Sequence, residues 1–129
     1  MTHYLLDTHV VIWLLEADSN LSETLVATIN DTKNRISVSI ATLWEMTIKH
    51  SLGKLELKKS LSEIFSHLES LDINILDIRE KHLLALQQLP FHHRDPFDRI
   101  IISQSISEEI TLISKDSVFN EYDITLLWK

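Results

Sequence analysis

The sequence predicts an α/β fold in which a mostly parallel sheet is covered by helices on both faces. Short apolar segments alternate along the chain with longer segments whose apolar residues recur at helical spacing. This alternation is typical of βα units, which place their strands in parallel. The chain has 129 residues with one glycine and two prolines, so no flexible linker divides it. Residues 1–129 are therefore expected to form a single domain.

Each strand is expected where a short apolar segment is bounded by polar residues. The strands are placed at residues 3–7, 35–39, 73–78, 111–114 and 124–128. The first of them (HYLLD) reads as a buried strand, and the second (RISVS) is short and β-branched. This pattern leaves the order of the strands in the sheet open.

Helical spacing of apolar residues defines the elements between the strands. The expected helices cover residues 10–16, a segment that ends at 29, and residues 40–52, 61–71, 80–88 and 96–109, with a short helix or turn at 117–122. The turn cluster at residues 18–20 opens the second helix. Gly53 supplies the stop of the third helix, and Pro96 begins the sixth after a loop at residues 89–94.

Composition restricts the environment and the possible partners. The formal net charge of −7 argues against binding nucleic acid through a broadly basic surface, although bound cations would offset part of this excess. The absence of cysteine excludes disulfides and zinc–thiolate sites. No apolar stretch approaches the roughly 18 residues that span a bilayer, and the N-terminus lacks the basic start of a secretory signal. These features predict a cytoplasmic protein that does not enter a membrane.

Acidic residues recur where an apolar strand ends and a helix begins. They are Asp7, Glu45, Asp95, Asp98 and Asp116. Because the carboxyl ends of parallel strands line one crevice, these side chains could converge although they are far apart in the chain. Carboxylates without thiols suit a hard divalent cation such as Mg²⁺ or Mn²⁺. The favoured interpretation is metal-assisted cleavage of a phosphodiester.

Helix capping is a structural alternative for three of these acids. Asp7, Asp95 and Asp116 each precede an expected helix, where a carboxylate accepts hydrogen bonds from free backbone N–H groups. Glu45 lies in the second turn of its helix, so its only evident structural role is an i,i+4 pair with Lys49 on an exposed face. The conjunction of the acids favours a functional site more strongly than any one of them does.

Two other kinds of catalytic or binding site lack their sequence signatures. No Gly-x-Ser-x-Gly segment provides a nucleophile elbow. The single glycine also excludes the glycine-rich loops that cradle phosphates.

The acidic segments resemble four motifs of the PIN-domain family, in the order of that family. They are residues 4–13 (YLLDTHVVIW), 37–46 (SVSIATLWEM), 93–104 (HRDPFDRIIISQ) and 112–116 (LISKD). The third motif is similar to the variety found in VapC-like toxins of bacterial type II toxin–antitoxin systems. The length also matches a stand-alone PIN protein.

The resemblance implies a three-layer α/β/α sandwich and a Mg²⁺- or Mn²⁺-dependent endoribonuclease that cuts RNA. It also implies a homodimer that a cognate antitoxin protein silences. Carried over by position, the catalytic and metal-binding residues would be Asp7, Glu45, Asp98 and Asp116. Asp98 is preferred in the third motif because it begins an apolar helical run. Asp95 would then cap that helix and could reach the metal through water.

Several other residues are assigned weaker roles. His92 and His93 are expected to be exposed or structural. The basic side chains near the acids could contact substrate phosphate or pair with a neighbouring acid; they are Lys49, Arg94, Arg99 and Lys115. The tryptophans are assigned to the core or to a subunit contact; they are Trp13, Trp44 and Trp128.

Two alternative functions remain open. A phospho-accepting, receiver-like regulatory domain needs an acceptor aspartate at the end of a central strand, and Asp77 is the nearest candidate. Ile78 continues the same apolar run, which fits that role poorly. A catalytically silent PIN-like binding module would bind metal without turnover.

Overall fold

Five parallel strands form the central sheet in the order β3-β2-β1-β4-β5. The computed structural model describes residues 1–129, and its strands are β1 (His3–Leu6), β2 (Arg35–Ser39), β3 (Asn74–Leu76), β4 (Thr111–Ile113) and β5 (Leu126–Leu127). The chain adds β2 and β3 on one side of β1, and then β4 and β5 on the other. In open α/β sheets, this switch of direction marks the crevice where ligands bind.

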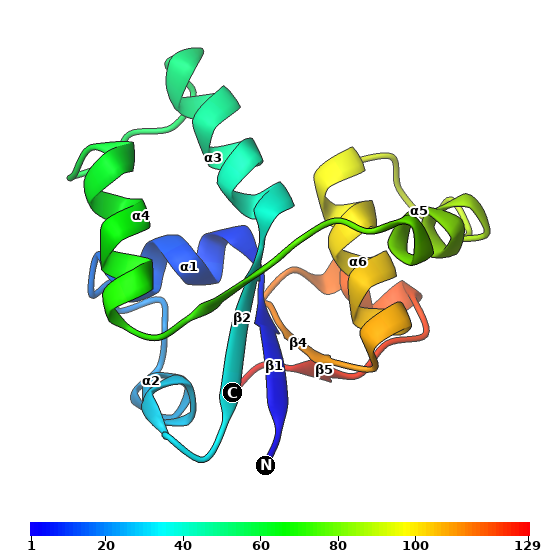
Figure 1. Ribbon diagram of the computed structural model, residues 1–129, viewed down its shortest axis with the longest axis horizontal. Coiled ribbons are helices and arrows are strands. Elements are labelled where there is room, and N and C mark those ends of the chain that lie inside the picture. The colour runs from blue at the N-terminus through cyan, green and yellow to red at the C-terminus, as the bar shows by residue number, and fades with distance from the viewer.

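Helices cover both faces of the sheet (Figure 1). One side carries α1 (Thr8–Leu15), α2 (Glu23–Asn30) and α4 (Leu61–Ser70), and the other carries α5 (Glu80–Gln87) and α6 (Pro96–Glu108). α3 (Ile40–Ser51) continues from the end of β2, and the short 3-10 helix η1 (Ser117–Glu121) follows β4. None of the helices combines the length and the apolar character needed to cross a membrane. The predicted three-layer α/β/α sandwich is confirmed.

Each face of the sheet has its own apolar core. Leu5 and Leu6 are consecutive in β1 and fully buried, with Leu6 in the core beside α1, α2 and α4 and Leu5 in the core beside α6. This explains why two consecutive residues of β1 are leucine, since the inner part of a strand buried on both faces has no polar side. α3 contributes to both cores, through Met46 on one side and Ala41 on the other.

Capping side chains explain why two helices begin elsewhere than expected. α1 begins at Thr8 instead of residue 10 because Asp7 caps it. The Asp18 carboxylate accepts a hydrogen bond from the backbone N–H of Asn20, which makes the expected start of α2 a separate turn. α2 begins after that turn, where the Ser22 hydroxyl accepts from the N–H of Leu25 and caps the helix.

Gly53 ends α3 as the sequence predicted. Its φ angle is 70°, and its N–H donates to the carbonyl of His50, while the N–H of Lys54 donates to the carbonyl of Lys49. This pair of bonds is the Schellman pattern. The left-handed conformation costs a residue with a side chain about 1–2 kcal/mol, which glycine avoids.

The two edge strands are shorter than predicted. Residues 73–78 supply only the three residues of β3, and residues 124–128 supply only the two residues of β5. Each edge strand has a single neighbour, so its ladder ends where the pairing with β2 or β4 ends. The interior strands β1 and β2 lie within one residue of the predicted ranges.

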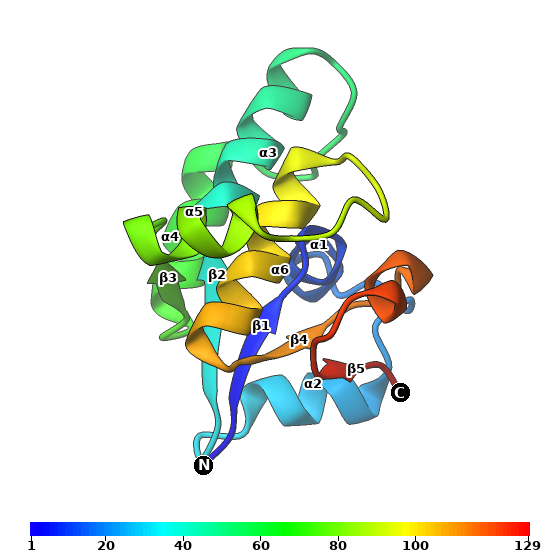
Figure 2. The same ribbon diagram turned by 90° about the vertical axis from the view of Figure 1, so that its right-hand side faces the viewer.

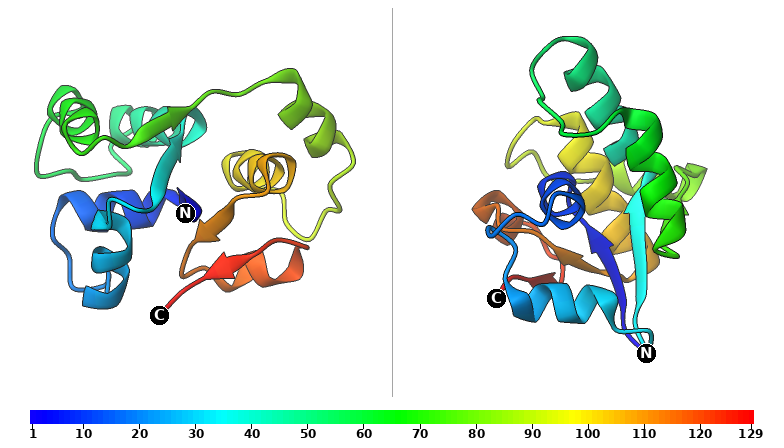
Figure 3. Two further views of the ribbon diagram at one scale, coloured as in Figure 1. Left: turned by 60° about the horizontal axis from the view of Figure 1, so that its bottom comes forward. Right: turned by 90° about the vertical axis from the view of Figure 1, so that its left-hand side faces the viewer.

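The carboxyl ends of the strands meet the starts of several helices at one edge of the sheet. α1, α3 and the first half of α6 all lie at the upper end of β1 and β2, whereas the N-terminus lies at the lower end (Figure 2 and the right view of Figure 3). β4 ends at the same edge and leads into η1. The residues that the sequence singled out lie at these junctions.

Candidate functional site

Asp7 is fixed at the end of β1 by hydrogen bonds to both of its carboxylate oxygens. Oδ1 accepts from the backbone N–H of Thr8 at 2.6 Å, and Oδ2 accepts from the Ser114 hydroxyl at 2.8 Å. Asp7 is only 4% exposed. This burial raises the pKa of Asp7, while the bond from Ser114 and the charge of His9 oppose the rise. Asp7 is thus both the cap of α1 and a buried carboxylate at the sheet edge.

Glu45 brings a second buried carboxylate to the same edge from α3. Its Oε1 accepts from the Thr8 hydroxyl at 2.6 Å, and its Oε2 pairs with Nζ of Lys49 at 2.5 Å. The predicted pair with Lys49 is confirmed. The prediction that this pair lies on an exposed face is wrong for Glu45, which is 3% exposed because it packs against Thr8 of α1. The hydrogen bond to Glu45 raises the pKa of Lys49.

Asp95 and Asp98 occupy different positions at the start of α6. Asp95 is the N-cap, and its Oδ1 accepts from the N–H groups of Phe97 and Asp98 at 2.9 and 3.2 Å. Oδ2 of Asp98 lies 3.2 Å from Nε2 of His93. The predicted cap role of Asp95 is confirmed, whereas the carboxylate of Asp98 caps no helix.

Asp116 follows β4 and caps η1. Its Oδ1 accepts from the N–H of Val118 at 3.1 Å, and its own N–H donates to the Ser114 hydroxyl at 3.1 Å. Ser114 therefore bridges Asp116 and Asp7 through one hydroxyl. Sequence reasoning gave Ser114 no role, although a hydroxyl at a strand end two residues before an acid was a usable signal.

The charges of these acids act on one another across the sheet edge. The pKa of Asp98 rises from 3.8 to about 8, first through burial and then through the negative charges of Asp95, Asp7, Glu45 and Asp116. The structure thus brings all five predicted acids close enough for their charges to interact. They come from four separate parts of the chain.

The chemistry of this donor set fits a hard divalent cation. Every candidate ligand is a carboxylate, and the hydrogen bonds of Asp95 and Asp116 occupy only Oδ1, which leaves Oδ2 available. No three acidic or histidine side chains lie close enough together in this arrangement to enclose an ion. The residue types therefore match such a cation, but side chains would have to move inward to hold it.

Arg99 contradicts one expectation. Its guanidinium donates to the backbone carbonyls of Leu89 and Pro90, and the ring of Phe91 lies 3.9 Å from it. Arg99 is 4% exposed. The prediction that Arg99 could contact substrate phosphate is wrong, because its donors are used inside the protein to hold the loop at residues 89–94.

His93 has a structural role that includes one of the acids. Its Nδ1 lies 2.7 Å from the hydroxyl of Tyr122, and its Nε2 faces Asp98. Sequence reasoning did not identify Tyr122, which is distant in the chain and carries no local signal. The two histidines were expected to be exposed or structural: His92 is exposed, and His93 is structural and also contacts Asp98.

The positions of the tryptophans and of Asp77 bear on two further expectations. Trp44 is 57% exposed and packs edge-on against Phe97 with ring centroids 5.1 Å apart, which excludes the core and leaves the expected alternative of a subunit contact untested. Trp13 and Trp128 are partly buried against the first core, as expected. Asp77 is exposed beyond the edge strand β3, so the aspartate named for the receiver alternative does not lie at the end of a central strand.

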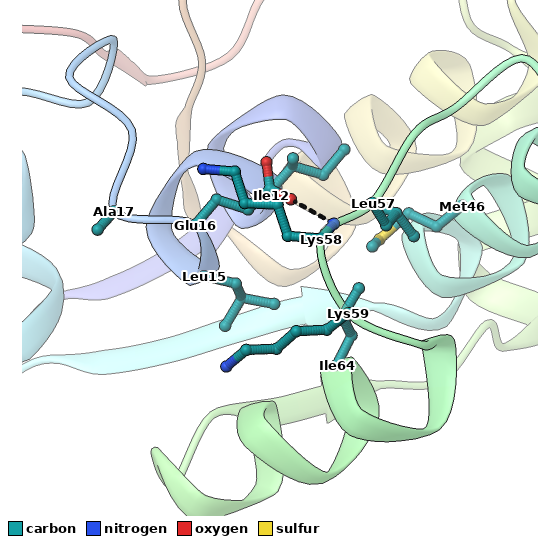
Figure 4. Close-up of a pocket in the computed structure, with 9 residues that line it drawn as sticks. All are labelled: Ile12, Leu15, Glu16, Ala17, Met46, Leu57, Lys58, Lys59 and Ile64. Carbon is teal, nitrogen blue, oxygen red and sulfur yellow. Dashed lines mark hydrogen bonds between the residues drawn. The ribbon is translucent and has the colours of Figure 1, made fainter.

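A separate recess of about 210 Å³ lies between α1, α3, α4 and the segment before α4 (Figure 4). It is lined by Ile12, Leu15, Glu16, Ala17, Met46, Leu57, Lys58, Lys59 and Ile64. Most of this lining is apolar, and its one carboxylate, Glu16, accepts from the backbone N–H of Lys58. The recess therefore lacks the carboxylate cluster of the sheet edge and presents an apolar surface beside two lysines.

Replacing Asp98 is expected to alter the pH dependence of stability. The folded pKa of about 8 lies above the ordinary 3.8, so folding keeps a proton that the unfolded chain releases. The stability that comes from protonated Asp98 is fully present below about pH 4 and is lost as the pH rises to about 8. In EDTA, Asp98→Asn should be more stable than the parent at pH 8 and less sensitive to pH between 4 and 8.

Urea unfolding at a series of pH values measures this effect. Asp77→Asn, at an exposed aspartate outside the cluster, is the matched control and should leave the slope unchanged. An unaltered slope in Asp98→Asn would show that burial and the neighbouring acids do not raise the pKa of Asp98 as described.

The comparisons with known proteins agree with this geometry. The sequence matches the family model of the PIN domain over residues 4–124, and no curated protein sequence matches it. Among solved structures, one similar chain belongs to VapBC2 from Rickettsia felis, which is bound to a DNA fragment from its promoter. It is 18% identical, with a TM-score of 0.76 and coverage of 98% of both chains. VapBC-1 from nontypeable Haemophilus influenzae is 20% identical, with a TM-score of 0.69 and coverage of 98% of this chain and 97% of that chain.

A third solved structure is also similar to this chain. VapBC-5 from Mycobacterium tuberculosis, a member of the VapBC family of toxin–antitoxin systems, is 19% identical, with a TM-score of 0.63 and coverage of 98% of this chain and 97% of that chain. At these identities the structures establish a shared fold. The family model covers all four motifs that carry the acids, and the chain therefore belongs to the PIN-domain family.

Proposed function

We propose that the chain is a divalent-metal-dependent endoribonuclease that acts as the toxin of a toxin–antitoxin pair. The observation that carries this proposal is the gathering of five carboxylates from four separate parts of the chain at the carboxyl edge of a parallel sheet. Such a cluster is unfavourable without cations, because like charges in a partly buried site repel one another. A role in holding cations accounts for the cluster better than capping does, since Glu45 and Asp98 cap no helix.

The proposed ligands have distinct roles. Asp7 and Asp116, which Ser114 links, would hold the ion directly. Glu45 and Asp98 would complete the site or orient the attacking water, and Asp95 would act through water. When bound, Mg²⁺ or Mn²⁺ supplies Lewis acidity toward a phosphate oxygen and lowers the pKa of water.

Hydrogen bonds prepare the carboxylates for this task. Contacts with the Thr8 hydroxyl and with Lys49 fix the orientation of the Glu45 carboxylate. The hydrogen bond from Ser114 fixes that of Asp7 in the same way. At neutral pH and without a cation, Asp98 carries a proton because its pKa is about 8. A cation would displace that proton, so its affinity should rise with pH up to about 8.

Two observations support the toxin assignment. The chain belongs to the PIN-domain family, and the similar structures include a member of the VapBC family of toxin–antitoxin systems. The recess in Figure 4 offers a mostly apolar surface with Lys58 and Lys59, suited to an apolar segment of an antitoxin that also carries acidic residues. This recess is separate from the acids, so an antitoxin could occupy it without replacing their hydrogen bonds.

We also propose that the chain forms a homodimer. Large apolar side chains are exposed on α3 and α5, namely Ile40, Trp44, Leu83 and Leu84. A second copy would bury them. Sedimentation equilibrium should give twice the chain mass of 15.0 kDa at micromolar concentration, and Leu84→Glu should shift the equilibrium toward the monomer. A mass of one chain at all concentrations would contradict the dimer.

Asp7→Asn tests the nuclease directly. The amide keeps the size of the side chain and can still accept from Thr8, so the fold should persist while the charged ligand is lost. Purified parent should cut RNA with Mg²⁺ or Mn²⁺ and not with EDTA, and Asp7→Asn should lose at least about 100-fold in rate. In cells, expression of the parent should arrest growth, whereas expression of Asp7→Asn should not.

The alternative outcomes separate the hypotheses. Metal binding by calorimetry without cleavage of any RNA would favour the catalytically silent module. Equal cleavage by Asp7→Asn and the parent would contradict the assigned site. Asp123→Asn, at an exposed aspartate outside the cluster, is the control for the loss of one negative charge.

A further inference from the structure

A small recess opens beside the acids on the side of α1 and the loop after β4. It has a volume of about 270 Å³ and is lined by Asp7, His9, Trp13, Lys115 and Asp116. Two of these residues are proposed metal ligands, but His9, Trp13 and Lys115 have no part in the metal site. An aromatic ring and a cation therefore adjoin the carboxylates in one concave surface.

The ring of Trp13 is held in place by its neighbours. It packs against Trp128 with centroids 6.0 Å apart, and the His9 ring lies 5.9 Å away, one helical turn earlier in α1. Trp13 is half-buried, so part of its surface packs on the core while it also lines the recess. A ring held in this way is a platform on which a nucleobase can stack at little entropic cost.

Lys115 adds positive charge beside this ring. Its Nζ lies 5.9 Å from the centre of the Trp13 ring, and the side chain is exposed. None of the four ion pairs of the structure involves Lys115. In a chain with a net charge of −7, a cation without an ion-pair partner next to two carboxylates favours contact with a phosphate.

The volume also limits what this recess can hold. Small-molecule sites usually measure about 300–1,000 Å³, and this recess falls just below that range. Its opening beside Asp7 and Asp116 suits one unit of a longer strand that continues past the acids. Single-stranded nucleic acid is bound in this way, by stacking of its bases and by cations along its backbone.

We propose that this recess is a nucleotide subsite, in which a base of single-stranded RNA stacks on Trp13 and its phosphate contacts Lys115. The proposal rests on the proposed ribonuclease function for its substrate class. It assigns Trp13 to substrate binding in addition to core packing. The subsite places the neighbouring phosphate of the strand at the carboxylates.

Tryptophan fluorescence can test this subsite without any turnover. The double variant Trp44→Phe, Trp128→Phe leaves Trp13 as the single tryptophan. It is titrated with a single-stranded RNA hexamer and with an abasic hexamer of equal charge. Ca²⁺ replaces Mg²⁺, and a gel verifies that the RNA stays intact. The RNA should quench Trp13 and bind roughly 5- to 150-fold more tightly than the abasic strand, the range expected for one stacked base.

Variants in the full-length protein separate stacking from packing. By fluorescence anisotropy of a labelled hexamer, Trp13→Leu should weaken binding by a similar factor, and Trp13→Phe should restore most of it. Phe65→Leu, at an exposed aromatic on α4, is the matched control and should not change the affinity. In cleavage assays, Trp13→Leu should raise KM with little change in kcat.

The salt dependence of RNA binding tests the contact between Lys115 and phosphate. Lys115→Ala should lower the slope of log affinity against log salt by about one, the effect of removing one phosphate contact. Lys33→Ala, in the turn before β2 at the opposite edge of the sheet, should leave the slope unchanged.

The outcomes distinguish this proposal from the proposed function. Metal-dependent cleavage with no quenching of Trp13, or with equal affinity for the abasic strand, would overturn the subsite and leave the nuclease. Base-dependent quenching without cleavage under any condition would support the subsite and contradict the nuclease. A Trp13→Leu variant that only unfolds at lower temperature, with unchanged affinity, would also overturn the subsite.

Discussion

The burial of carboxylates at the sheet edge, together with their mutual repulsion, is the constraint on which the rest of the site depends. The negative charges of four other acids help to raise the pKa of Asp98, and burial raises the pKa of Asp7. The protein offsets this cost locally through Lys49, which pairs with Glu45, and through the hydroxyls of Thr8 and Ser114. A site that is unfavourable alone and favourable with a cation couples metal affinity to pH and to stability.

Helix capping and metal binding are compatible in this structure. Asp7, Asp95 and Asp116 each use Oδ1 to cap a helix. The caps fix the carboxylates at the points where strands become helices, and Oδ2 of Asp95 and Asp116 takes no hydrogen bond. The same local interactions that begin the helices therefore position the candidate ligands, so a demonstrated cap does not argue against a functional role.

The sequence allowed the fold class, the long helices and the gathering of the acids to be predicted, because periodicity and strand-end position are local signals. The two-residue strand β5 was overestimated because edge pairing depends on tertiary contacts. Arg99 was misassigned because its partners are backbone carbonyls of a loop, which no sequence pattern displays. Tyr122 was missed for a related reason, since its partner His93 is distant in the chain. The bond of Ser114 to Asp7 also joins distant parts of the chain, although the position of Ser114 just before Asp116 was a local signal.

The central claim is that these carboxylates form one divalent-cation site. Crystals grown with Mn²⁺ and measured at a wavelength that gives anomalous scattering from manganese would test it most directly. The account predicts an anomalous peak in contact with Asp7 and at least one of Asp98 and Asp116, with these side chains closer together than in the present structure. Saturating Mn²⁺ with no peak at the sheet edge, or a peak only on unrelated surface acids, would contradict it.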